Sequence, residues 1–247
     1  MIKIRIVGDG PLAAVTRRCC AGRFDLASDT PDLLWICADT PIHADGRADV
    51  RPILELVAFG LHAVSPRQPL VVLSSQVPIG TTHWLETLFP SVTCVYVPEN
   101  VRVAHADEDF NSQPRIVIGR RTIAHDALLA DVFSQFSHQL IWTDPETAEL
   151  SKHALNAFFG LQIAYINELA NVAAAVGADV AVVSRALLTD WRVSPHAPLR
   201  PGAPFGGGHL SRDLHVLEDL AARLNLTVPI VQAIHPSNQR RVAVSLA

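Results

Sequence analysis

The sequence predicts an α/β fold, in which a Rossmann-like, mostly parallel sheet is followed by a long central helix and an all-helical dimerisation domain. Short apolar runs alternate with helical stretches through the first 143 residues, a pattern typical of a parallel sheet covered by helices. A glycine-rich turn follows the first of these runs, and residues 144–177 read as one long helix. We therefore expect a dinucleotide-binding domain at 1–143 and a helical dimerisation and substrate domain at 144–247.

Composition narrows the class of protein. The chain has 247 residues, of which 49% are hydrophobic, and a formal net charge of −4. The absence of a basic tract argues against nucleic acid and anionic membranes as partners, and no apolar run reaches the length of a membrane span. The four cysteines show no C-x-x-C pattern, which favours reduced thiols and a cytoplasmic location. No pair among the 11 histidines has a familiar zinc spacing, so we expect no metal.

The first strand, at residues 2–7, leads into Gly-Asp-Gly-Pro-Leu-Ala and a helix that continues to about residue 21. In a G-x-G-x-x-A turn the glycines allow the chain to turn tightly, and the helix N-terminus offers free N–H groups to a pyrophosphate. A pyrophosphate-binding turn is therefore predicted at Gly8, Gly10, Pro11 and Leu12. An adenosine ribose is typically bound by an acid about 20 residues further on, where Asp29 stands. The next strand begins too soon for a full crossover, so we expect residues 23–29 to form a stunted second strand and to weaken the ribose site.

The alternation then becomes regular. Strands are expected at residues 33–38, 70–74, 93–97, 115–118 and 140–142, and helices at 50–62, 81–88 and 123–133. Ligands of such sheets bind beyond the carboxyl ends of the strands, which carry Thr40, Gln76 and Glu99. Each of these three is equally compatible with an ordinary turn.

The long helix has well-defined ends. Asp144 is a suitable N-cap, Pro145 suits the first helical position, and Gly177 suits a left-handed stop. The middle of the helix, residues 155–176, is apolar on nearly every side, which predicts burial between domains or subunits. Lys152 and Asn156 share one of its faces, and this pair is also compatible with a solvated helix end.

Four more segments follow this helix. A second helix is expected at 180–188, a loop rich in proline and glycine at 192–208, and helices from residue 210 and from about 229 to 247. The triple glycine at the end of the loop suits close approach to a ligand, although a flexible connector is equally compatible with it.

In this order, the segments IRIVGDG, SSQVPIGTT, VPENVRVAHADEDFNSQPRIVIG, ETAELSKHALNAF and PGAPFGGGHLSRD resemble the UDP-glucose/GDP-mannose dehydrogenase family over nearly the whole chain. The resemblance implies two successive NAD-dependent oxidations of a nucleotide sugar and a dimer built on the long helix. It also implies that Lys152 and Asn156 stabilise a developing oxyanion and that Glu99 is the base of thioester hydrolysis. The family's aspartate is retained as Asp213.

The departures from the family pattern concern its covalent step. The family's last motif places a catalytic cysteine where this sequence has His209, and a lysine where it has Arg212. Gln76 replaces a family threonine, and the chain ends at Ala247, so we expect a truncated member without the C-terminal nucleotide-binding domain. An imidazole can carry a proton but does not form a comparable thioester. His209 filling the volume of the lost cysteine is the alternative.

We therefore expect an NAD(P)-linked oxidoreductase that performs a single alcohol oxidation, with His209 or Lys152 as the proton carrier. Two alternatives remain open: a non-catalytic paralogue that binds a small molecule or a partner, and a non-redox acid–base enzyme. The expected partners are a sugar-like substrate and a second copy of the chain. In the enzyme, the side chains of His209, Lys152 and Asn156 should converge on one cavity.

Overall fold

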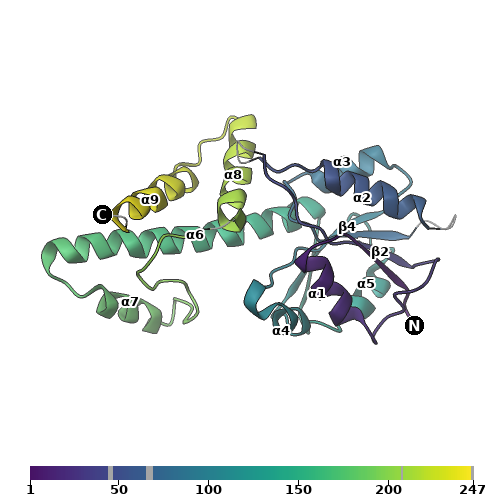
Figure 1. Ribbon diagram of the computed structural model, residues 1–247, viewed down its shortest axis with the longest axis horizontal. Coiled ribbons are helices and arrows are strands. Elements are labelled where there is room, and N and C mark those ends of the chain that lie inside the picture. The colour runs from purple at the N-terminus through teal and green to yellow at the C-terminus, as the bar shows by residue number, and fades with distance from the viewer. Residues whose placement is uncertain (44–46, 65–68, 207, 246–247) are drawn as a thin grey trace. The chain divides into compact units, whose positions relative to one another are not determined.

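A computed structural model describes residues 1–43, 47–64, 69–206 and 208–245 of the chain (Figure 1). The described chain divides into two compact units, Met1–Lys152 and His153–Ala247. The division falls inside the long helix α6 (Pro145–Val176), between Lys152 and His153. The domain boundary at 143/144, placed at the start of this helix, stays a prediction.

The first unit is built on one six-stranded sheet. Its strands are β1 (Ile4–Val7), β2 (Leu33–Ile36), β3 (Leu70–Leu73), β4 (Cys94–Tyr96), β5 (Ile116–Gly119) and β6 (Leu140–Thr143). They lie side by side in chain order. The pairs β1–β2, β2–β3, β3–β4 and β5–β6 are parallel, and β4 and β5 pair antiparallel. The predicted mostly parallel sheet is therefore confirmed.

Helices cover both faces of this sheet (Figure 1). They are α1 (Pro11–Cys20), α2 (Arg51–His62), α3 (Thr81–Leu88), α4 (Ala106–Asn111) and α5 (Asp126–Phe133), with a short 3₁₀ turn at Val103–His105. One core joins the sheet to α1, α4 and α5, and a second joins its other face to α2, α3 and the start of α6. Burial on both faces explains why strands such as β2 and β3 are apolar at every position.

The stunted second strand is confirmed. Among the described residues, the segment after α1 joins the sheet through one isolated parallel bridge, between Asp25 and Lys3, the residue before β1. It is held by two backbone hydrogen bonds of 2.9 Å, from Ile4 N–H to the Asp25 carbonyl and from Asp25 N–H to the Ile2 carbonyl. The sequence analysis missed one element of this unit, helix α4, because it has six residues and buries only Phe110.

The second unit consists of the rest of α6 with α7 (Val180–Thr189), α8 (Gly208–Arg223) and α9 (Pro229–Ser245). Its core gathers Ala157 and Ala164 of α6 with Leu214 of α8 and Ile234 of α9. The all-helical character predicted for this part of the chain holds for its described residues. Among the helices described, none is both long enough and apolar enough to cross a membrane.

Helix α6 begins and ends as its sequence indicates. Asp144 accepts a hydrogen bond of 2.8 Å from the backbone N–H of Thr147, and Gly177 has a positive φ of 74°. Large apolar residues remain exposed along the helix within one chain. Phe158 is 53% exposed, Tyr165 50% and Val172 59%.

Candidate active site

The glycine-rich turn between β1 and α1 has the backbone that its sequence predicts. Gly8 and Gly10 have φ values of 130° and 93°, which residues other than glycine rarely adopt. A Cβ atom added at Gly8 would lie 2.0 Å from the Cys37 carbonyl oxygen, so only glycine allows the turn to pack against the end of β2. Gly10 is the N-cap of α1 and no side chain caps this helix, which leaves its first N–H groups for a ligand such as a pyrophosphate. Pro11 and Leu12 stand at the start of α1, as predicted.

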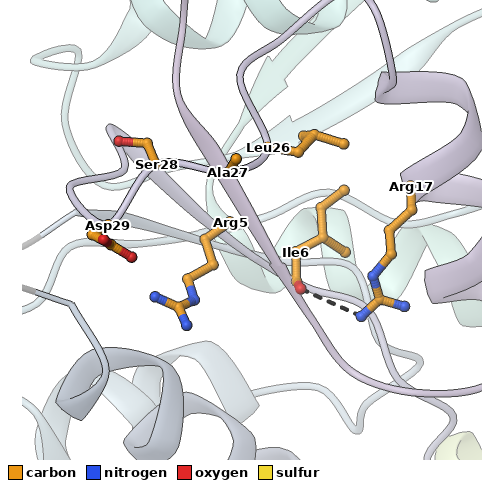
Figure 2. Close-up of a pocket in the computed structure, with 7 residues that line it drawn as sticks. All are labelled: Arg5, Ile6, Arg17, Leu26, Ala27, Ser28 and Asp29. Atoms are coloured by element: carbon orange, nitrogen blue, oxygen red, sulfur yellow. Dashed lines mark hydrogen bonds between the residues drawn. The ribbon is translucent and has the colours of Figure 1, made fainter.

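A hollow lies beside β1, on the side where a longer second strand would continue the sheet (Figure 2). Its volume is about 280 Å³, and it is lined by Arg5, Ile6, Arg17, Leu26, Ala27, Ser28 and Asp29. The Arg17 guanidinium donates a hydrogen bond of 2.7 Å to the Gly8 carbonyl and so brings positive charge to the glycine turn. Asp29 lies in a loop at this hollow and not at the end of a strand, so its predicted ribose contact stays a prediction.

Three further candidate residues, Thr40, Gln76 and Glu99, follow the carboxyl ends of β2, β3 and β4. Thr40 is buried, Gln76 is partly buried, and Glu99 is 8% exposed. Because β1 to β4 are all parallel, these three residues and the glycine turn follow neighbouring strands at one edge of the sheet. Ser75 stiffens this edge, since its hydroxyl accepts a hydrogen bond of 3.0 Å from the Ala38 N–H.

Lys152 contacts the loop that carries Glu99. Its Nζ donates hydrogen bonds to the Glu99 backbone carbonyl at 2.5 Å and to Asn100 Oδ1 at 3.3 Å. Burial raises the pKa of the Glu99 carboxyl group to about 7, against the opposing effect of the Lys152 charge. The Glu99 Oε2 atom is buried and has no hydrogen-bond partner within the described chain. A buried carboxyl group that titrates near neutrality is suited to accept or donate a proton.

The second unit contains a buried polar group around Asp213. One carboxylate oxygen of Asp213 lies 2.6 Å from His153 Nδ1, and the other accepts a hydrogen bond from Asn156 Nδ2. The side chains of Asp213 and His153 are fully buried. Asp213 therefore fixes the orientation of the Asn156 amide. Sequence reasoning missed His153, although its position three residues before Asn156 put both on one helical face.

The structure pairs four of the five predicted catalytic residues within their own units. Glu99 lies with Lys152 in the first unit, and Asn156 lies with Asp213 in the second. The side chain of His209 falls outside the described part of the structure, although its backbone belongs to α8. The convergence of His209, Lys152 and Asn156 on one cavity therefore stays a prediction.

Sequence reasoning also missed the role of Glu149. This fully buried carboxylate of α6 accepts hydrogen bonds from the backbone N–H groups of Gly80 and Thr82 and from the Thr82 hydroxyl. It thus caps the N-terminus of α3, which carries no capping side chain at its own N-cap position. Glu149 therefore has a structural role, and this contact anchors the start of α6 on the first unit.

Comparison with known proteins identifies two domains of one family. Residues 3–137 match the NAD binding domain of the UDP-glucose/GDP-mannose dehydrogenase family, and residues 146–240 match its central domain. A UDP-glucose 6-dehydrogenase from Rickettsia bellii is 30% identical over 218 residues, which cover 85% of this chain and 50% of that protein. One from Bacillus subtilis is 28% identical over 86% of this chain and 50% of its own length. The chain thus spans about half the length of these curated relatives.

Solved structures agree with this assignment. A UDP-glucose dehydrogenase from Pyrobaculum islandicum superposes with a TM-score of 0.82 at 30% identity, covering 94% of this chain and 57% of that one. A UDP-D-ManNAc dehydrogenase from Pyrococcus horikoshii also gives a TM-score of 0.82, over 99% of this chain and 70% of that one. At 18% identity, the second likeness supports the fold alone.

Proposed function

Because this chain belongs to the UDP-glucose/GDP-mannose dehydrogenase family, we propose that it is an NAD(P)-linked oxidoreductase that oxidises one CH–OH group of a sugar-like substrate and stops at the carbonyl. The observation that carries the proposal is the contact between Lys152 and the Glu99 loop, at the sheet edge that also holds the glycine turn. The uncapped N-terminus of α1 and the positive φ of Gly8 and Gly10 fit the pyrophosphate of the cofactor.

Each residue has a defined task in this proposal. Bound NAD would supply the hydride acceptor. Lys152 provides a positive charge that stabilises a developing alkoxide, and Asn156 is retained as a second donor because the family resemblance implies that role. The hydroxyl proton passes to a basic group. His209 is the candidate from the sequence, and Glu99 is supported by its pKa of about 7.

The limit to one oxidation rests on the missing nucleophile. Position 209 holds histidine where the family has its cysteine. The four cysteines of the chain are free and buried, and burial raises the pKa of each thiol, that of Cys20 and Cys94 to about 12. Buried thiols of this kind do not form the reactive thiolate that a second oxidation needs. Free, buried cysteines also support the proposed cytoplasmic location.

Cofactor titration tests the proposal. Full-length protein should bind NADH saturably, seen as a rise in nicotinamide fluorescence. Gly10→Ala should weaken binding at least about tenfold, because a methyl group then stands where the backbone meets charged phosphates and each such hydrogen bond contributes roughly 1.5–3 kcal/mol. Gly80→Ala is the matched control, since Gly80 is also a helix N-cap with φ 93° and has open space around its Cα.

Three outcomes would contradict this function. Absence of NADH, NAD and NADPH binding would favour the non-catalytic paralogue, an alternative that the stunted second strand supports. Steady production of NADH from UDP-glucose with accumulation of UDP-glucuronate would instead refute the single-step limit. Cofactor binding without any hydride transfer to or from sugar-like alcohols and carbonyls would leave the acid–base alternative in its place.

We also propose that the chain is a homodimer built on α6. Phe158, Tyr165 and Val172 follow one another at intervals of seven residues, so they form one exposed apolar stripe on the helix. A second copy of the chain would remove this stripe from water. The double substitution Tyr165→Glu and Val172→Glu should convert a dimer into a monomer, as measured by light scattering at micromolar concentration. Ile123→Glu, at an apolar position of the first unit that is 75% exposed, should leave the dimer intact. A wild-type monomer would refute the proposal.

A further inference from the structure

Three metal-ligating side chains meet between α8 and α9, outside the groups described above. His215 and Glu218 come from α8 and His235 comes from α9. One donor atom of each lies within 4.8 Å of the donor atoms of the other two. The two imidazole rings face one another, with centroids 4.4 Å apart and planes inclined by 39°.

The separations fit ligands around an ion better than direct hydrogen bonds. His215 Nδ1 lies 3.4 Å from one oxygen of Glu218, and His235 Nδ1 lies 3.7 Å from the other. Hydrogen bonds from nitrogen to oxygen typically span about 2.7–3.2 Å. Two ligands that each lie about 2.0–2.1 Å from a tetrahedral zinc ion are themselves about 3.3–3.4 Å apart. Small side-chain shifts would therefore bring all three donors into coordination distance.

The polypeptide holds these side chains in place before any ion binds. His215 and Glu218 are three residues apart on one helix and so share a face. Their partner His235 directly follows Ile234, which packs in the core of the second unit with Leu214, the neighbour of His215.

A nearby contact also fixes α9. Asn238, one turn after His235, exchanges two hydrogen bonds of 2.9 Å with the backbone of Phe205.

One ring nitrogen of His235 lacks a hydrogen-bond partner among the described residues. Its side chain is 15% exposed, and its Nε2 atom is buried with no hydrogen-bond partner in the part of the chain that the structure describes. Desolvating a polar atom without a partner is costly, and the Glu218 contact, which is made by Nδ1, leaves Nε2 unsatisfied. His215, whose side chain is 43% exposed, keeps the cluster open to solvent on one side.

We propose that His215, Glu218 and His235 bind one divalent transition-metal ion, with zinc as the preferred ion. Two imidazole nitrogens and one carboxylate oxygen suit zinc and its tetrahedral neighbours, whereas magnesium and calcium require mostly oxygen ligands. The exposed side leaves the fourth position to water. The bound ion would link α8 to α9 and so stabilise the second unit.

Metal titration of the full-length chain tests the site. Protein stripped with a chelator should bind one equivalent of Zn²⁺ in competition with a chromophoric chelator, and Co²⁺ should give the visible absorption of a tetrahedral complex. Glu218→Gln keeps the shape of the side chain, and His215→Asn shortens a side chain that is 43% exposed, so both variants should fold. Each should bind Zn²⁺ at least about tenfold more weakly, since even loss of an outer-shell partner typically costs 10–100-fold. His196→Asn, at an exposed histidine of the same unit, should bind like the wild type.

Thermal unfolding supplies the second readout. Zn²⁺ should raise the melting temperature of the wild type and of His196→Asn but not that of Glu218→Gln. The site is refuted if the wild type binds less than one equivalent, or if Glu218→Gln and His215→Asn retain wild-type affinity. A Co²⁺ complex with thiolate charge-transfer absorption would also refute it, because the ion would then be bound by cysteine.

Discussion

Replacing Asp213 with alanine is expected to destabilise the protein by about 3–5 kcal/mol. The carboxylate is fully buried. One of its oxygens contacts His153 Nδ1, and the other accepts a hydrogen bond from Asn156. Alanine would leave both of these side chains without their common acceptor, and it would open space between α6 and α8. Chemical denaturation followed by circular dichroism measures the loss, and hydrogen exchange resolved to α8 locates it.

A second aspartate on the same helix provides the control. Asp219 pairs with Arg223 at 3.3 Å, and the two side chains are 33% and 59% exposed. Removal of a solvated pair of this kind costs at most about 1 kcal/mol, so Asp219→Ala should unfold nearly like the wild type. Asp213→Asn should fall between the two, because an amide can accept from only one of the two neighbours while its own NH₂ faces the other. Equal stability of Asp213→Ala and Asp219→Ala would show that the buried group around Asp213 contributes little.

The sequence predicted the sheet well because its central strands β2, β3 and β4 are buried at every position. Continuous apolar runs such as Leu70–Leu73 are typical of strands buried in a parallel sheet, and the glycine turn at Gly8 and Gly10 follows from backbone geometry that only glycine adopts freely. The six-residue helix α4 was missed because its acidic surface and single buried Phe110 give no helical period. The antiparallel pairing of β4 with β5, through Tyr96 and Gly119, depends on tertiary packing and has no local pattern.

The sequence predicted only those residues of the candidate site that a motif places at a fixed position. Lys152, Asn156, Glu99 and Asp213 were singled out by spacing and family resemblance, but Asn100 and His153, which also contact Lys152 and Asp213, were not. No motif distinguishes His153 from other helical histidines. The cluster of His215, Glu218 and His235 joins two helices, so no fixed sequence spacing predicts it. Glu149 caps α3 through Thr82, which lies 67 positions earlier in the chain, and no local motif encodes such a contact.

The last expected result concerns Glu99, whose buried charge should make the protein less stable as the pH rises. The folded pKa of about 7 lies above the ordinary value of 4.5, so the folded state binds the Glu99 proton more tightly than the unfolded state. The stabilisation from this proton is complete below about pH 4.5 and is lost as the pH rises through 7. A shift of about 2.5 units corresponds to roughly 3 kcal/mol. Glu99→Gln should therefore be nearly neutral at pH 4.5 and more stable than the wild type by roughly 2–3 kcal/mol at pH 8.

Urea unfolding of both proteins between pH 4.5 and 8 isolates this group, because all other titrations largely cancel in the difference. Glu108→Gln is the matched control, since it makes the same substitution in the same unit at a carboxylate that is 78% exposed and not buried. Lys152→Met should move the Glu99 transition to higher pH, since the ammonium group is what opposes the effect of burial. A flat difference between Glu99→Gln and the wild type would mean that the carboxyl group is hydrated in solution. Glu99 would then titrate as an ordinary surface acid, and its proposed role in proton transfer would fall with it.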